Sequence, residues 1–290
     1  MMQTQMNISP VKKEGSLFFY KFIKNKMALA GFAILGVILV CSLFAPFLTS
    51  YDPTRTNIGQ QFQAPSALHW FGTDEVGRDI FSRVLYGSRL SLGIGITVVV
   101  SAGTIGTFLG TISGYLGGKV DQVIMRIMDM VLAFPTLILA MALAAALGPN
   151  LLNAMIAIAI VKIPVYVRLA RGETLALREK LFVQAAVTFG IPSWRIIARH
   201  IVPNAISPVV IQVTLDIGDA ILMVATLGFL GLGAQPPTPE WGAMISIGWK
   251  YLLDYWWYPT FPGLALFLAS GALNLIGDGI RDILDPKSSR

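Results

Sequence analysis

Long apolar runs are the feature that most restricts what this chain can fold into. Several of them are close to the roughly 20 residues that an α-helix needs to cross a bilayer. Only 13% of the 290 residues are charged, whereas 54% are hydrophobic, and ordinary soluble domains carry about 25% charged residues. The sequence therefore predicts an all-α, polytopic membrane protein with a lipid-embedded core.

Six apolar runs are long enough to be transmembrane helices. The first is too long for the hydrophobic part of a signal peptide, and its end, "LFAPFLTSYDP", has no small-x-small cleavage pattern. We therefore expect it to remain as an uncleaved helix. The expected spans are 27–48, 90–116, 123–147, 151–169, 205–233 and 260–276.

These spans divide the chain into five parts. We expect an N-terminal tail, a first transmembrane helix, an extracytoplasmic or interfacial segment, a core that contains one long cytoplasmic loop, and a C-terminal tail. Their bounds are 1–26, 27–48, 49–89, 90–281 with the loop at 173–203, and 282–290.

The distribution of lysine and arginine predicts the orientation. Six helices place both termini and the loop at 173–203 on one side, where 16 basic residues fall: Lys12, Lys13, Lys21, Lys24, Lys26, Lys119, Arg126, Arg168, Arg171, Arg178, Lys180, Arg195, Arg199, Arg281, Lys287 and Arg290. The other side has five: Arg55, Arg78, Arg83, Arg89 and Lys250. Because cytoplasmic loops carry the excess of positive charge, both termini and the loop are predicted to be cytoplasmic. The net charge of +6 then needs no nucleic-acid partner.

Motifs for catalysis or cofactor binding are missing from the sequence. The nearest match to a phosphate-binding loop, "GYLGGKV" at 114–120, has a misplaced first glycine, and Val120 replaces the required Ser or Thr. There is no HExxH or GxSxG sequence. His69 and His200 lack Cys or Glu at ligand spacing, and the single cysteine, Cys41, can form no intrachain disulfide. We expect no catalytic, metal or cofactor site, and no ATPase site in this chain.

Three ionisable residues lie inside predicted spans, where charge is costly and usually functional. Asp216 and Asp219 share one face of the fifth span, and Lys162 lies in the fourth. One interpretation is a buried structural network in which they pair with one another. The other is that they line a water-filled pathway for a polar substrate. Near the cytoplasmic end of the third span, snorkelling explains Arg126 and Asp129.

The second span carries a stripe of glycines at small-xxx-small spacing. Such stripes let helix backbones approach closely, so we expect tight packing, with a sliding face as the functional alternative. The stripe consists of Gly103, Gly106, Gly110, Gly114 and Gly117.

The loop "VQAAVTFGIPSWRIIARHIVPN" is compact and basic between apolar runs. We expect a helix over 174–189, ended by Gly190 in a conformation with positive φ, and a second helix that begins at Pro192 and stops near Pro203. The second helix is expected to place Trp194, Ile197 and Ile201 on an apolar side and Arg195 and Arg199 on a basic side. The residues alone leave two readings open: an interfacial helix on anionic lipid, or a rigid knob that docks into a soluble partner.

This loop resembles the EAA loop of the permease subunits of binding-protein-dependent ABC importers. The signature has Glu-Ala-Ala, a glycine four residues after the second alanine, and an Ile-x-x-Pro-like end. Ala185, Ala186, Gly190, Ile201 and Pro203 match, while Gln184 replaces the glutamate and removes its charge. The resemblance implies docking to an ATPase through Gln184, Ala185, Ala186, Gly190, Trp194, Arg195, Arg199 and Pro203.

Further motifs, in the expected order, are similar to the C-type permeases of the peptide and nickel class. They are "HWFGTDEVGRDIFSRVLYGSRLSL", "DQVIMRIMDMVLAFPTLILA", "LGFLGLGAQPPTPEWGAM" and "NLIGDGIRDILDPK". The resemblance implies a type I ABC importer permease fold in the bacterial inner membrane. It also implies a B-type permease partner, two cytoplasmic ATPases that bind ATP, and an extracytoplasmic binding protein.

The outer segment 50–89 has two readings. "GRDIFSRVL" is expected to lie along the membrane as an interfacial elbow. The segment is also a candidate docking surface for the binding protein, with contributions from Asp74, Glu75, Arg78 and Asp79.

Together these observations predict an importer subunit for di- or oligopeptides, with a weaker likeness to D,D-dipeptide permeases. Nickel-chelate and glutathione permeases share the same motifs and remain alternatives. An ATP-independent secondary transporter or channel is the alternative from another class, and the embedded aspartates are the feature that favours it.

Overall fold

The computed structural model describes residues 25–284, and the expectations for residues 1–24 and 285–290 lie outside it. Over the described range the chain is helical, with one isolated bridge between Thr73 and Asp79, which confirms the all-α fold class. The helices are α2 (Lys26–Leu43), α3 (Ala45–Leu48), η1 (Ile58–Gln60), α4 (Ile80–Leu116), α5 (Gly118–Leu132), α6 (Thr136–Leu147), α7 (Leu151–Arg178), α8 (Leu181–Thr188), α9 (Ser193–Ile196), η2 (Ile197–Ile201), α10 (Val202–Phe229), α11 (Trp241–Trp249) and α12 (Trp257–Leu284).

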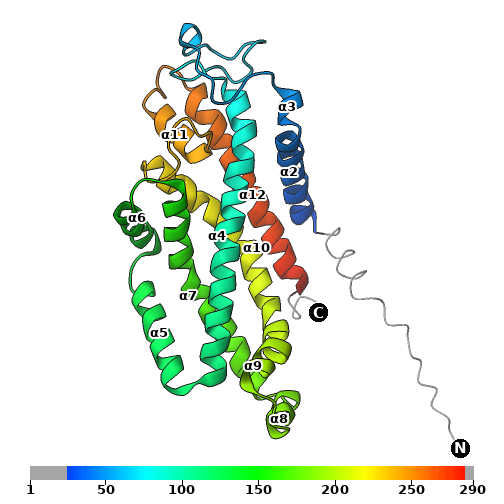
Figure 1. Cartoon of the computed structure of the whole chain (residues 1–290). Helices are drawn as coiled ribbons and strands as arrows, with labels where there is room; N and C mark the ends of the chain where they lie inside the picture. Colours follow the sequence, from blue (N-terminus) through cyan, green and yellow to red (C-terminus); the bar gives the residue numbers. More distant parts are fainter. Residues whose placement is uncertain (1–24, 285–290) are drawn as a thin grey trace, which may run out of the picture.

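Figure 1 shows an elongated bundle with α4 along its middle. One end of the bundle carries α8 and α9, and the other carries α11 and the long α3–α4 connection. Helix α2 runs away from the α8 end and α12 runs toward it. The described chain therefore starts and finishes its spans on the side of α8, as an even number of crossings requires.

Five single helices are long and apolar enough to cross a membrane, and a sixth crossing requires α5 and α6 together. These two helices are bent by 93° relative to each other, so the third expected span, 123–147, is broken rather than straight. The break coincides with Pro135, which caps α6. Proline lacks an N–H to donate and disfavours helical backbone at the residue before it.

Helix α4 begins ten residues earlier than the expected second span at residue 90. Asp79 caps its first turn, because the Asp79 carboxylate accepts a hydrogen bond from the Ser82 N–H at 2.7 Å. The segment "IFSRVL" is thus the start of one continuous 37-residue helix. The expectation of a separate interfacial elbow there was wrong, since the capping aspartate starts the helix before the apolar run begins.

The glycine stripe of α4 lies against α7, and this is the most extensive helix pair of the bundle. A Cβ added to Gly106 would come within 2.4 Å of the Tyr166 Cβ, and one added to Gly110 within 2.5 Å of the Val167 carbonyl oxygen. The two backbones are therefore as close as glycine permits, which confirms the expected tight packing.

We predict that Gly106→Val will destabilise the bundle by about 1–3 kcal/mol, because the new side chain has to displace Tyr166. Gly93→Ala on the same helix is the matched control, since nothing lies within 4 Å of a Cβ added to Gly93. Thermal unfolding in detergent, followed by the loss of the monodisperse peak in size-exclusion chromatography, measures both. Equal melting temperatures for the two variants would contradict the packing argument.

Candidate functional site

The segment Leu181–Ile201, which we call the α8–η2 segment, projects from one end of the bundle (Figure 1). Its central turn is built on Gly190, which has φ of +72°, as the sequence predicted. The Gly190 N–H donates to the Val187 carbonyl at 2.9 Å, and the Ile191 N–H donates to the Ala186 carbonyl at 3.1 Å. These two bonds form the Schellman arrangement that closes a helix end. The turn is therefore well defined by its own backbone.

Helix α8 is shorter than the helix expected over 174–189. Helix α7 continues to Arg178, and the extended backbone of Lys180 separates it from α8. A small apolar core forms on the resulting bend: Val183, Ala186, Ile196 and Ile201 are buried, with Tyr115, Leu177 and Ile191 packed on them. Tyr115 belongs to α4 and Leu177 to α7, so the core attaches the α8–η2 segment to two long helices.

The second helix of the segment does not stop near Pro203, and that expectation was wrong. Residues Ile197–Ile201 form a π-turn, in which the Val202 N–H donates to the Ile197 carbonyl. Pro203 then lies in the first turn of α10, where a missing N–H is tolerated. As a result, α9, η2 and α10 form one rod of 37 residues from Ser193 to Phe229.

The π-turn also changes which side chains are buried. Ile196 and Ile201 are 1% and 0% exposed, whereas Trp194 is 65% exposed. The expected apolar side was therefore right for Ile201 and wrong for Trp194, while Ile197 is only partly buried. An extra residue in the turn brings positions five apart onto one face, and a pattern read with α-helical spacing misses this.

The outward face of the α8–η2 segment combines large apolar side chains with basic ones. Leu181 and Phe189 are 83% and 84% exposed, and sequence reasoning missed both. The Arg195 guanidinium lies over the Trp194 ring, 5.2 Å from its centroid. Among the other predicted contact residues, only Ala186 is buried, while Gln184, Ala185, Gly190, Arg199 and Pro203 are exposed.

Gln184 lies at a groove between the α8–η2 segment and the ends of α4 and α7. Its amide donates to the Glu179 carbonyl at 3.3 Å, so the residue that replaces glutamate bonds within its own chain. The groove is lined by Tyr115, Leu116, Arg178, Glu179, Val183, Gln184, Val187, Thr188 and Ser193.

We predict that Gly190→Pro will abolish transport while the protein still inserts into the membrane. Proline fixes φ near −65°, whereas this position has φ of +72°, and the substitution also removes the N–H that bonds Val187. Gly190→Ala should give a partial loss, because alanine tolerates positive φ at a cost of about 1 kcal/mol. Uptake is measured with membrane-fraction abundance as control, and normal uptake by the proline variant would contradict a rigid turn.

The three ionisable residues of the predicted spans meet between α7 and α10. The Lys162 ammonium lies 2.6 Å from an Asp219 oxygen and 3.7 Å from an Asp216 oxygen. The Tyr166 hydroxyl donates to Asp216 at 2.6 Å, and the Gln212 amide donates to its other oxygen at 3.2 Å. Sequence reasoning missed Tyr166 and Gln212. Each lies four residues from a predicted member, Lys162 and Asp216, and this spacing could have found them.

Near the α8 end, ion pairs connect α5 to α7. Arg171 forms a two-pronged pair with Asp121, with bonds of 2.6 and 2.7 Å. Asp129 pairs with Arg168 at 2.7 Å, and both side chains are about half exposed. Asp129 therefore has a partner in the chain, which the snorkelling interpretation did not include.

At the opposite end, most of the proposed docking residues are buried inside the chain. Asp74, Arg78 and Asp79 are 0%, 4% and 4% exposed. Asp74 pairs with Arg78 at 2.6 Å, and Asp79 pairs with His69 at 2.9 Å. The expectation was therefore wrong for Asp74, Arg78 and Asp79, because these buried side chains are bonded within the chain.

Other bonds connect this outer loop to distant helices. Glu75 accepts hydrogen bonds from Arg78 and from the Tyr258 hydroxyl of α12. Arg83 of α4 donates to the carbonyls of Pro53 and Pro237 at 2.8 and 3.2 Å. The hydrogen bonds of Glu75 and Arg83 therefore join the outer loop to α12, to α4 and to the α10–α11 connection.

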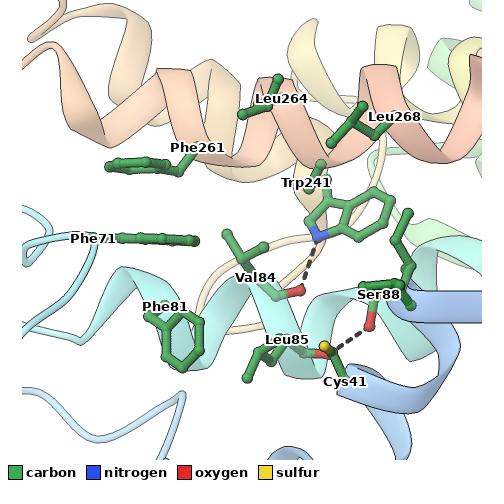
Figure 2. Close-up of a pocket in the computed structure, with 13 residues that line it drawn as sticks. Cys41, Phe71, Phe81, Val84, Leu85, Ser88, Trp241, Phe261, Leu264 and Leu268 are labelled. Carbon is green, nitrogen blue, oxygen red and sulfur yellow. Dashed lines mark hydrogen bonds between the residues drawn. The ribbon is translucent and has the colours of Figure 1, made fainter. Parts of the chain in front are cut away.

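An apolar pocket lies between α2, α4 and α12, beside Trp241 (Figure 2). The Trp241 indole donates to the Val84 carbonyl at 3.0 Å, and the Ser88 hydroxyl donates to the Leu85 carbonyl at 2.5 Å. With both polar groups bonded to α4, the walls offer apolar contacts, which suit hydrocarbon better than a charged solute.

Buried Glu240 places Trp241 in this wall. Its carboxylate caps α11, with bonds of 2.9 Å from the Gly242 N–H and 2.8 Å from the Ala243 N–H. Burial raises the pKa of the Glu240 carboxyl, and these two N–H groups act against that rise.

Comparison with known proteins identifies the family. Residues 106–290 match the family model of the inner membrane component of binding-protein-dependent transport systems. Residues 15–65 match the family model of the N-terminal transmembrane domain of oligopeptide transport permease C. The chain belongs to this family of transport permeases. The resemblance carried by the sequence motifs is thereby confirmed, and five or six apolar helices agree with a multi-pass membrane protein.

Individual relatives cover nearly the whole chain. A probable D,D-dipeptide transport system permease protein of Escherichia coli strain K12 is 57% identical over 255 residues, which cover 88% of this chain and 86% of the relative. A dipeptide transport system permease protein of Alkalihalophilus pseudofirmus is 49% identical, with 93% and 88% covered. A glutathione transport system permease protein of Pectobacterium atrosepticum is 41% identical, with 93% and 90% covered.

Proposed function

We propose that this permease is the C-type subunit of an ATP-driven importer for di- or oligopeptides. It would form the substrate pathway with a homologous B-type permease in the bacterial inner membrane. Two cytoplasmic ATPases would supply the energy, and an extracytoplasmic binding protein would deliver the substrate. The names of the relatives support the peptide class, and D,D-dipeptides are the favoured members of it.

The exposed apolar tip of the α8–η2 segment is the observation that carries the coupling role. Leu181 and Phe189 are exposed on a segment that a small apolar core attaches to α4 and α7. Apolar side chains at the centre of an interface contribute most when a partner excludes water from them. Because the rod of α9, η2 and α10 is continuous, a displacement at the tip would reach the embedded charges of α10.

Charge supports a cytoplasmic position for this end. Six basic residues assigned to that side belong to the start of α5, the end of α7, the N-cap of α8 and the α8–η2 segment: Lys119, Arg171, Arg178, Lys180, Arg195 and Arg199. The bias of cytoplasmic loops toward lysine and arginine supports a cytoplasmic position for α8. Both chain ends would lie on the same side.

Glutathione is a second candidate substrate, because glutathione permeases are among the relatives at 41% identity. A glutathione importer would have the same partners and the same coupling segment. A secondary transporter would instead work without an ATPase. These three possibilities are distinguished by uptake of labelled dipeptide and of glutathione into proteoliposomes. Each uptake is measured with and without ATP on the side of the membrane that carries the ATPase subunits.

We predict that Phe189→Asp will release the ATPase subunits from the purified complex. A carboxylate at the centre of an apolar interface should cost about 2 kcal/mol or more, which is about a 30-fold loss of affinity. Leu253→Asp is the matched control, because Leu253 is 97% exposed at the opposite end of the bundle. The measurement is the amount of ATPase that co-purifies with each tagged variant. Equal recovery for both variants would contradict docking through this tip.

A further inference from the structure

Helix α10 carries a polar stripe that the rest of the chain covers only in part. Gln212, Asp216, Asp219 and Thr226 follow one another at intervals of four, three and seven residues, which is the spacing of one helix face. A neighbouring face is packed against α12, where a Cβ added to Gly218 would lie 2.9 Å from the Ser270 carbonyl oxygen. Within the stripe, Asp219 is the exposed residue, whereas Gln212, Asp216 and Thr226 are half-buried.

The two aspartates of the stripe differ in how completely they are bonded. Both oxygens of Asp216 have partners, since Tyr166 bonds one and Gln212 and Lys162 approach the other. Its side chain is 17% exposed. Asp216 is thus bonded at both oxygens and mostly buried, as expected of a structural residue in a buried network.

Asp219 has an unused oxygen. The Lys162 ammonium bonds one carboxylate oxygen at 2.6 Å, and over residues 25–284 the other oxygen accepts no hydrogen bond. The Asp219 side chain is 59% exposed, while that of Lys162 is 9% exposed. The lysine is thus enclosed by the bundle and bonded to a carboxylate that is itself largely exposed.

The charge balance of this group is unequal. One lysine faces two aspartates, so the cluster has an excess of one acidic group inside a membrane-spanning helix. Asp219 lies ten residues, or about 15 Å, inside the outer end of α10. A carboxylate exposed to hydrocarbon at such a depth is costly, so this face requires water and a cation rather than lipid.

We propose that Asp219 binds a cationic group of the transported solute, a primary ammonium such as the free N-terminus of a peptide. The unused oxygen accepts the hydrogen bond, Lys162 fixes the carboxylate, and Asp216 completes the lysine's neutralisation. This inference rests on the proposed role of the chain as a peptide importer and assigns one contact within its pathway. A charge-assisted hydrogen bond of this kind gives both attraction and a preferred orientation of the solute.

The first test compares charge variants in a reconstituted complex. For L-alanyl-L-alanine, Asp219→Asn should lower the uptake rate about tenfold, the loss expected for one hydrogen bond to a charged group, and Asp219→Glu should retain most of it. For N-acetyl-L-alanyl-L-alanine, which has no ammonium, the ratio of variant to native uptake should stay close to one. Because every variant is assayed with the same binding protein, this ratio reports on the permease.

Two matched variants distinguish a direct contact with the solute from the general effect of removing a charge or of destabilising the protein. Asp216→Asn removes an equal charge from the same helix but from a bonded carboxylate, so it should lower uptake of the free and the acetylated dipeptide alike. Asp278→Asn removes an exposed carboxylate from α12 and should change neither. If Asp219→Asn lowers the uptake of both dipeptides equally, Asp219 is a structural counter-ion of Lys162 and the proposal is overturned.

A second test does not depend on acceptance of the acetylated dipeptide. In a Cys41→Ser background, Asp219→Cys is treated with a negatively charged or a positively charged methanethiosulfonate reagent. Restoration of L-alanyl-L-alanine uptake by the negative reagent, and none by the positive one, supports the proposal. Equal effects of the two reagents, or no reaction with either, would place the side chain outside a cation-binding pathway.

Failure of this inference is distinct from failure of the proposed function. Native uptake that stops when the ATPase subunits are inactivated establishes the importer, whatever Asp219 does. If native uptake continues without the ATPases, the proposed function fails first. The Asp219 variants then still report whether a cation is bound on this face.

Discussion

The close contact between α4 and α7 is the interaction on which the other parts of the structure depend. Glycines on α4 let the backbone of α7 approach until a single methyl group would collide with it. Helix α7 then supplies Lys162 and Tyr166 to the charged cluster at one level and Leu177 to the core of the α8–η2 segment at another. In lipid, where apolar burial gives little drive for helix association, such shape-matched contacts hold helices together.

Ionisable side chains serve different purposes at three levels of this bundle. In the outer loop they are buried and bonded to one another, so they fasten the loop to α4 and α12. At the α8 end, Arg168 and Arg171 hold α5. On α10, Asp219 has one oxygen bonded to the enclosed Lys162 and one oxygen unused among the described residues. A charge inside a membrane span is costly unless it is paired or faces water, which is why this position is the one we connect with the solute.

Local sequence rules predicted some elements well and failed at others for identifiable reasons. Gly190 was correctly predicted to adopt positive φ, because the requirement is local to one turn. The bend at Pro135, the early start of α4 at Asp79 and the π-turn before Pro203 were not predicted. Each depends on a cap or an alternative hydrogen-bond pattern, which apolar periodicity does not report.

The sequence by itself determined the membrane-spanning helical class, the transport family and the three charged residues of the cluster between α7 and α10. The length of the apolar runs, the order of the motifs and the few charged residues within the apolar runs can all be read directly from the sequence. Only the tertiary structure decided that Asp74 and Arg78 face inward, that Trp194 faces outward, and that Asp219 differs from Asp216. Exposure and bonding depend on contacts between residues far apart in the chain, and spacing along one helix carries no information about what covers each face.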